Sequence, residues 1–424
     1  MQKKRMQILS VIVLMVCAIS CKKNTQGIPS TSTTPTITAI DVLSGIPGAT
    51  VKITGTNFNS KILADTVTFN GAVASVTLVS ATQIVVSVPP DATSGKIVLK
   101  TNGTTLAYPT DFRIIQLVET TIGGKLSIAS IAVDPAGNIY WHSGSFVGKF
   151  LPSGKLDTLA KIGNGYTYIG GMAVDAADNI YVSALYDFTI PATSALHTTN
   201  DYKIYKITPS GLVTVFAGTG SAGTADGTAA TAQFTAPAGI AIDGSGNLYV
   251  TDVNVVRKIT AAGTVTTFAG SGALGQADGQ GRAATFNALN YITADANGNL
   301  YVIDFVTTVN SIISTIRKIS PSGAVTTIPK YPAPYTSNVF GVGAFAVDAT
   351  GNFYISARPW AIQPGGDYLY MTTFAGAYGG IYLGGAGNIN GEAFDASGNL
   401  YVSYQVNYYL DPTSYGYVTK IAFK

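Results

Sequence analysis

Short runs of alternating apolar and polar residues, bounded by Gly, Asp, Asn and Pro, follow one another along the chain from Pro35 onward. This period of two is typical of half-buried β-strands. Between residues 35 and 114 the runs, such as Val51–Asn57 and Gln83–Pro89, are separated by turn signals at roughly 8–12-residue spacing, as in a small β-sandwich. We therefore expect residues 35–114 to form an all-β domain of their own.

A longer unit begins after residue 114, and its clearest copy is Pro237–Gly270. It divides into four strands rich in β-branched and aromatic residues. Asp243–Asn247 forms the tight turn between the first two strands, because Asp accepts backbone N–H groups and a later Gly adopts positive φ. A four-stranded meander of this length cannot bury both of its faces alone, so several copies must stack.

The first hairpin of this unit recurs six times, each time with an acid at the start of its turn. Only the second copy lacks the turn glycine, and its Asp178 is one of the few side chains that tolerate that conformation. The six turn acids are Asp134, Asp175, Asp243, Asp295, Asp348 and Asp395. Repeats of this length and pattern predict a ring of six blades, a β-propeller.

The two ends of the repeat region predict how the ring closes. The sixth copy ends with its third strand, Val418–Lys424, and the segment Gln116–Gly124 has the pattern of the missing fourth strand. Pairing these two segments removes the exposed sheet edges that favour aggregation. The sequence therefore predicts an all-β protein, with an N-terminal β-sandwich followed by a six-bladed β-propeller over residues 115–424 that is closed by its N-terminal strand.

Two family resemblances agree with this division. The blades resemble NHL-repeat propellers, most closely from Gly218 to Asp252, and residues 35–114 resemble the IPT/TIG immunoglobulin-like family on Gly48, Val51–Phe58 and Val67–Gly71. The first resemblance implies a fold that presents ligand surfaces, without one fixed activity. The second implies an immunoglobulin-like sandwich that serves as a spacer or an interaction module.

The N-terminus has the plan of a bacterial export signal. Three basic residues precede the apolar run Ile8–Val16, and Ala18-Ile19-Ser20-Cys21 resembles a lipobox, so we expect residues 1–20 to be removed and Cys21 to be acylated. The apolar run is about half of the roughly 20 residues that a transmembrane helix needs. Residues 21–34 then read as a flexible tether. The expected location is the bacterial cell envelope, lipid-anchored at the outer membrane and facing the periplasm or the surface.

Charge and cysteine content exclude some partners. Residues 1–20 hold three of the 25 basic residues and none of the 22 acidic ones, so 22 of each remain. A mature charge near zero argues against nucleic acid as a partner. The chain has two cysteines, Cys17 in the signal and Cys21 at the anchor, so we expect no disulfide and no cysteine metal site.

Motifs for catalysis are weak. Two glycine fingerprints, beginning at Gly218 and Gly270, lead into strands and not into the helix that a dinucleotide site requires. The two histidines, His142 and His197, lie in different copies without metal-ligand spacing, and we identify no acid and Asn set for calcium. We therefore predict no catalytic residue, metal or cofactor. A propeller enzyme of the lyase or lactonase type is the alternative.

Loop lengths distinguish the two faces of the predicted ring. The turns after the first and third strands are short and uniform, whereas the connections after the second and fourth vary, notably at Ala184–Tyr202, Phe305–Thr315, Ala357–Tyr368 and Tyr404–Tyr417. Variable loops are the usual place for binding. The candidate ligand-binding residues are the aromatic residues of these loops, Tyr186, Trp360, Tyr368, Tyr404, Tyr408, Tyr409, Tyr415 and Tyr417. Such rings suit a glycan or a protein ligand, although for any one of them the preference of tyrosine for strands, or packing between blades, is the favoured explanation.

Overall fold

The computed structural model describes residues 34–62, 64–114, 118–122, 128–151, 155–163, 167–185, 201–307, 312–328, 339–348, 351, 353–359, 368–372, 378–382, 387–406 and 415–422. The chain divides into Met1–Thr34 and Pro35–Lys424. The predicted signal, Cys21 and nearly all of the tether lie outside the described residues. In the described part the structure is built from strands, apart from one short 3-10 helix, η1 (Gly281–Ala283), so the all-β prediction is confirmed.

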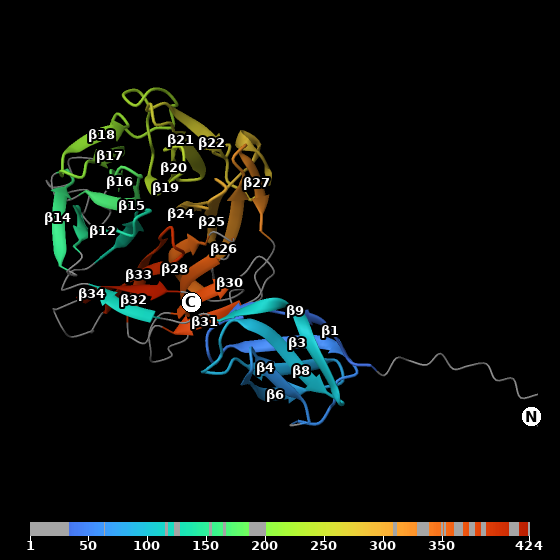
Figure 1. The fold of residues 1–424 in the computed structure, drawn as a ribbon. Helices are drawn as coiled ribbons and strands as arrows, with labels where there is room; N and C mark the ends of the chain where they lie inside the picture. Colours follow the sequence, from blue (N-terminus) through green and yellow to red (C-terminus); the bar gives the residue numbers. More distant parts are fainter. Residues whose placement is uncertain are drawn as a thin grey trace, which may run out of the picture. The chain divides into compact units, whose positions relative to one another are not determined.

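Two sheets form the sandwich between residues 35 and 114 (Figure 1). The first, in spatial order, contains β1 (Thr36–Ile40), β3 (Thr50–Thr56), β7 (Gln83–Ser87) and β6 (Ser75–Val79). The second contains β2 (Ser44–Gly45), β9 (Thr104–Ile114), β8 (Gly95–Thr101), β4 (Thr66–Phe69) and β5 (Ala72–Val73). In β3 every second side chain is buried, and Phe69 and Phe112 meet edge to face at 4.8 Å between ring centroids in the core.

Six further sheets follow in the described part of the chain, and Figure 1 shows them around a common axis. The first contains β11 (Ser130–Val133), β12 (Ile139–Ser143), β13 (Phe146–Phe150) and β14 (Leu156–Lys161). The second contains β15 (Tyr168–Val174), β16 (Ile180–Leu185), β17 (Lys203–Ile207) and β18 (Val213–Ala217). The third contains β19 (Pro237–Ile242), β20 (Leu248–Asp252), β21 (Val255–Ile259) and β22 (Val265–Ala269).

The fourth sheet contains β24 (Leu289–Ala294), β25 (Leu300–Thr307), β26 (Ile312–Ile319), β27 (Ala324–Thr327) and the short β23 (Gly279–Gln280). The fifth contains β28 (Val339–Val347), β29 (Phe353–Pro359), β30 (Tyr368–Thr372) and β31 (Tyr378–Tyr382). The sixth contains β32 (Gly387–Phe394), β33 (Leu400–Val406), β34 (Tyr415–Ala422) and β10 (Val118–Ile122). The last sheet joins the two ends of the repeat region, with Val118 opposite Ala422 and Ile122 opposite Val418.

The hydrophobic core of the ring lies between neighbouring sheets. One buried cluster combines Tyr140 and Val147 of the first sheet with Ile169 and Val182 of the second. The first strands of neighbouring sheets approach closely because glycine allows it: a Cβ at Gly239 would lie 2.5 Å from the backbone oxygen of Asn290. Each sheet therefore buries its faces against its neighbours, which is why one copy could not be stable alone.

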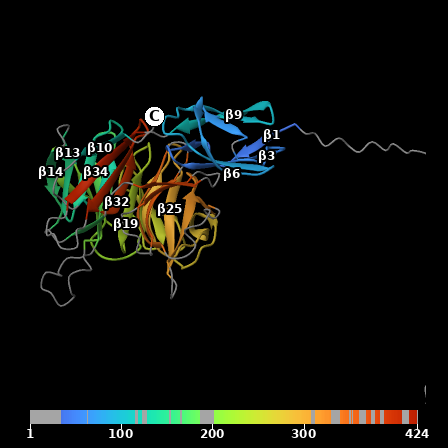
Figure 2. The same ribbon diagram turned by 90° about the horizontal axis from the view of Figure 1, so that it is seen from below.

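Figure 2 shows the ring edge on, with strands running between its two faces. On one face, the turn face, lie the hairpin turns that begin at the six turn acids. The opposite face, the loop face, is where β11, β15, β19, β24, β28 and β32 begin, because each of these strands ends at a turn acid. The connections after the second strand of each sheet also lie on the loop face.

The connections on the loop face differ from the expected boundaries. Tyr404 pairs with Tyr417 and Val406 with Tyr415, so β33 and β34 extend into both ends of the segment that we expected to be a loop. In the fourth sheet Thr307 pairs with Ile312, inside the expected loop Phe305–Thr315. The reason is that β-branched and aromatic residues continue the two-residue period past the core of the blade, so the ladder continues with it.

Candidate functional site

The predicted tyrosine site is only partly within the described residues. Tyr186, Trp360, Tyr408 and Tyr409 lie outside them, as does Phe188. Tyr368 lies in β30, Tyr404 in β33, and Tyr415 and Tyr417 in β34, and thus in strands instead of loops. The site residues on the loop face remain predictions.

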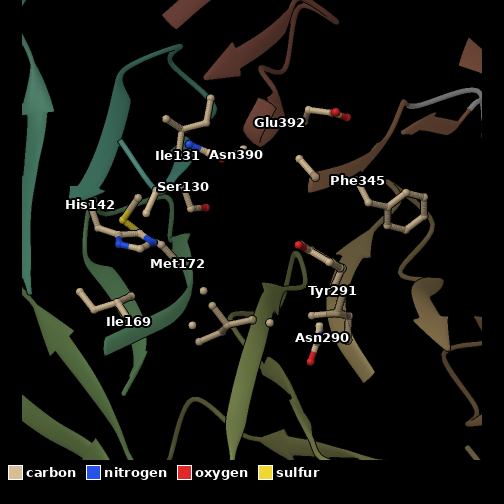
Figure 3. A pocket seen from close by; sticks show the side chains of 18 of the residues that line it. Ser130, Ile131, His142, Ile169, Met172, Asn290, Tyr291, Phe345, Asn390 and Glu392 are labelled. Carbon is tan, nitrogen blue, oxygen red and sulfur yellow. The ribbon is translucent and has the colours of Figure 1, made fainter. Parts of the chain in front are cut away.

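A cavity of about 420 Å³ opens where the six first strands converge at the axis of the ring (Figure 3). It is lined by the early residues of those strands, for example Ser130 of β11, Gly171 of β15 and Asn290 of β24. Because these strands begin on the loop face, the cavity lies on the same side as the variable connections. A second cavity of about 280 Å³ is lined by residues further along the same strands, toward the turn face.

Six residues line both cavities and occupy the same position in the six copies, three residues before each turn acid. They are Ile131, Met172, Ile240, Ile292, Phe345 and Glu392. Five of them are apolar, and the sixth is a carboxylic acid. Sequence reasoning missed this site, although the departure of Glu392 from the apolar residues of the other copies is visible in the repeat alignment.

Glu392 is buried, with 9% of its surface exposed. Within the described part of the chain neither of its carboxyl oxygens has a hydrogen-bond partner in bonding geometry. Burial raises the pKa of Glu392 well above its ordinary value, and the Ser356 hydroxyl and N–H lie close enough to offset only part of that rise. An unpaired carboxyl with a perturbed pKa at a cavity wall is a common mark of a functional site.

The other polar side chains of the cavity come from different sheets. His142 of β12 is buried and its Nδ1 has no partner among the described residues, while desolvation lowers its pKa to about 4. Tyr291 of β24 comes from the opposite side of the cavity (Figure 3), and burial, followed by the charges of Tyr168 and Glu392, raises its pKa to about 12. Asn390 donates from Nδ2 to the backbone oxygen of Ile128 at 3.0 Å.

Of the side chains that the structure describes around this cavity, none belongs to a lysine or an arginine. His142 is neutral above about pH 4, so the described lining carries no cation near neutral pH. Among the described residues no group of three or more His, Cys, Asp or Glu side chains is placed to hold a metal ion. The chemistry available in the cavity is therefore hydrogen bonding by hydroxyl, amide and imidazole groups, one carboxyl group, and the aromatic side chains of Tyr168 and Tyr291, whereas the ring of Phe345 stacks on Phe353.

The acids that follow the glycine fingerprints have structural roles. Asp226 pairs with buried Arg257 at 2.9 Å, and Asp278 pairs in the same way with buried Arg317 at 2.9 Å. The two aspartates lie in the linkers between sheets and the two arginines in β21 and β26, so these acids hold the linkers to the blades. None of the described residues forms a helix with the length and hydropathy required to cross a bilayer.

The fold and the cavity define a protein in which a β-sandwich precedes a propeller with a polar cavity at its axis. Residues 35–114 match the family model of the IPT/TIG domain, and residues 120–281 match that of the teneurin NHL domain. The predicted succession of an IPT/TIG domain and an NHL-repeat propeller is thereby confirmed. No curated protein matches the chain.

Similar solved structures include an auxiliary nutrient binding protein from Bacteroides ovatus, with 14% identity over 91% of this chain and 97% of that one and a TM-score of 0.41. They also include a gluconolactonase from Xanthomonas campestris, with 14% identity over 73% of this chain and 88% of that one and a TM-score of 0.43. Both share little sequence with this chain, so the functional argument rests on the residues of the cavity.

Proposed function

We propose that this protein is a non-catalytic binding protein of the cell envelope whose propeller takes up a small hydroxylated ligand, of the saccharide class, in the cavity on the loop face. The observation that carries the proposal is the convergence of polar side chains from separate sheets, His142, Asn290, Tyr291, Asn390 and Glu392, on one cavity at the axis. Its volume of about 420 Å³ falls in the range of small-molecule sites, roughly 300–1,000 Å³.

Saccharides fit the kinds of side chain present. Hydroxyl groups of a sugar both donate and accept hydrogen bonds, as the amides of Asn290 and Asn390 and the hydroxyl of Tyr291 also do. The aromatic rings of Tyr168 and Tyr291 offer apolar faces for the C–H surface of a sugar ring. The predicted aromatic loops on the same face, with Tyr408 and Tyr409, would extend this surface around the mouth of the cavity.

A glycan array followed by calorimetry on residues 35–424 tests the proposal. Replacing Tyr291 by Ala, or Tyr408 and Tyr409 together by Ala, should weaken the best array ligand by about 1–3 kcal/mol, because a stacking surface is lost. The matched control is Asp243→Ala on the turn face, which should lower stability and leave the affinity of the folded fraction unchanged.

Two results would contradict this assignment. If no saccharide on the array binds, the proposal that the ligand is a saccharide is wrong. A hit whose affinity ignores Tyr291 and the two loop tyrosines, but is lost when the IPT/TIG domain is altered, would move the site to residues 35–114. A protein ligand that competes for the same tyrosines would keep the loop face as the binding surface and replace the ligand class.

A propeller enzyme of the lyase or lactonase type is the second candidate, and one observation favours it. The carboxyl group of Glu392 and the amides of Asn290 and Asn390 line one cavity, and oxygen ligands of this kind suit a hard cation such as calcium. Calcium would there polarise the carbonyl oxygen of a bound substrate. Calorimetric titration with calcium alone tests this candidate: binding that is lost in Glu392→Gln favours it, and no binding excludes it.

A further inference from the structure

Glu392 occupies a position where the rest of the ring is apolar. Ile131, Met172, Ile240, Ile292 and Phe345 stand at the equivalent positions, and all six residues line the constriction between the two cavities. A carboxyl group at such a place costs free energy unless a partner compensates its charge. We therefore searched the surroundings of Glu392 for a group that compensates its charge.

The described surroundings of Glu392 supply no compensating charge. In the adjacent strands β28 and β29, the described side chains Ala344 and Phe345 at the cavity and Ser356 beside Glu392 are uncharged, while the side chain of Arg358 in β29 lies outside the described part. The titratable groups that share the cavity are Tyr291 of β24, Tyr168 of β15 and His142 of β12. Tyr291 is neutral near neutral pH, as tyrosine ordinarily is, and burial raises its pKa further to about 12, while His142 is neutral because burial lowers its pKa to about 4.

The aromatic lining makes the same site favourable for a cation. Tyr168 and Tyr291 line the cavity together with Glu392, and aromatic ring faces attract ammonium groups. An ammonium group has donors for a carboxylate and apolar neighbours that suit the rings. This combination of a carboxyl group without a hydrogen-bond partner, aromatic side chains and no lysine or arginine among the described lining residues points to an organic amine.

We propose that the saccharide bound in the cavity carries a free amino group, as an amino sugar does, and that this ammonium group pairs with the carboxylate of Glu392. The inference rests on the proposed function, because it assumes a saccharide in the cavity. It adds that the amino group of the ligand determines specificity and that Glu392 is the residue that recognises this group.

Pairing with an ammonium group requires the ionised form of Glu392. In the free protein burial favours the protonated acid, so the amine must bind with release of a proton from Glu392. The affinity for an amino sugar should therefore rise with pH as the carboxyl group ionises, up to the pH at which the amine itself loses its charge. A neutral sugar should lack this dependence.

Three disaccharides with one backbone test the inference: cellobiose with hydroxyl groups at C2, diacetylchitobiose with acetamides, and its deacetylated form with free amines. At about pH 7.5 the free amine should bind at least about tenfold more tightly than cellobiose, the advantage expected of one charge-assisted hydrogen bond. At about pH 5 this advantage should shrink, and calorimetry in buffers of different ionisation enthalpy should show proton release.

Glu392→Gln keeps the shape of the side chain and removes its charge, so the variant should bind the free amine and cellobiose alike at both pH values. Asp243→Asn, which alters a remote acid on the turn face, should keep the preference for the amine. If the wild type binds the amine no better than cellobiose, or if Glu392→Gln retains the preference, the inference is wrong and the proposed function stands. If none of the three disaccharides binds, the saccharide assignment fails and the inference fails with it.

Discussion

Two arginines have no exposed surface, and each pairs with carboxylates from two directions. Arg257 lies 2.9 Å from Asp226 and 3.4 Å from Asp252, and its guanidinium lies 5.2 Å from the ring centroid of Phe234. Arg317 repeats the arrangement one sheet further on, with Asp278, Asp304 and Phe286. Asp252 also accepts the backbone N–H of Thr235 at 2.9 Å.

We expect Arg257→Met to lower the free energy of unfolding by about 3–5 kcal/mol, because Asp252 would stay buried without its cation. Denaturant unfolding measures the loss. Arg282→Ala is the matched control, since Arg282 pairs with the same carboxylate of Asp226 from the surface, with 62% of its side chain exposed, and such pairs contribute about 1 kcal/mol or less. Equal losses in the two variants would contradict a special role for the buried pair.

The buried imidazole of His142 predicts a pH dependence of stability. Its pKa is lowered to about 4 from an ordinary value of 6.5, because burial disfavours the charged form. As pH falls below 6.5 the unfolded chain takes up this proton first, so His142 should cost the folded state roughly 3 kcal/mol by about pH 4. Above pH 6.5 the imidazole is neutral in both the folded and the unfolded chain, so this cost is absent.

His142→Gln should flatten the stability profile between pH 4 and pH 6.5, measured by denaturant unfolding. Glu392 acts with the opposite sign, since its raised pKa gives stability that is present below its unfolded pKa and lost as pH rises through its folded pKa. Comparing the pH profile of Glu392→Gln with that of the double variant Glu392→Gln, His142→Gln isolates the effect of the imidazole on stability. A profile that keeps its slope after His142→Gln would show that another group titrates.

At the scale of the element, the hairpin turn is held by its acid together with a tyrosine that the sequence pattern left without a role. Asp243 accepts the N–H groups of Ser245 and Asn247, both at 2.9 Å, and Gly246 adopts a φ of 76°. The hydroxyl of Tyr249, six residues after the acid, donates to the same carboxylate at 3.1 Å. This contact recurs in all six copies, so the tyrosine of the repeat fixes the turn from within the second strand.

The pairing of β10 with β34 predicts the result of a deletion. Removing Gln116 to Ile122 should leave β34 unpaired on one side and expose Val418 and Ile421, which are fully buried and each worth roughly 1.5–3 kcal/mol. Against a typical stability of about 5–15 kcal/mol, we expect a large fall in the melting temperature of the propeller, measured by calorimetry. An unchanged melting temperature would mean that the sixth sheet does not depend on this strand.

At the scale of the whole molecule, we expect the segment before Pro35 to determine where the propeller works, through the predicted lipid anchor at Cys21. We expect Cys21→Ala to leave an unprocessed or soluble protein, because acyl chains contribute about 0.8 kcal/mol per buried CH₂ to membrane attachment. Fractionation and labelling with a fatty acid measure the effect. Membrane association that persists in the variant, with label still incorporated, would reject the lipid anchor.

The sequence by itself determined the strands, the turns and the order of the two domains, because a two-residue period and the backbone demands of Asp, Asn and Gly are local. It also predicted the strand Gln116–Gly124 as the partner of the last strand. It could not determine how far β33 and β34 extend, since cross-strand pairs and not one strand decide that.

The tertiary structure alone decided the candidate site. Glu392, His142 and Tyr291 are 100 residues or more apart in the chain, and only the convergence of six first strands brings them to one cavity. The same holds for Arg257. From the sequence alone an arginine in an alternating strand is expected to face solvent, whereas in the structure its side chain is buried between Asp226 and Asp252. Burial alters the pKa values of Glu392, His142 and Tyr291, packing brings Arg257 to its carboxylates, and both are properties of the packed ring.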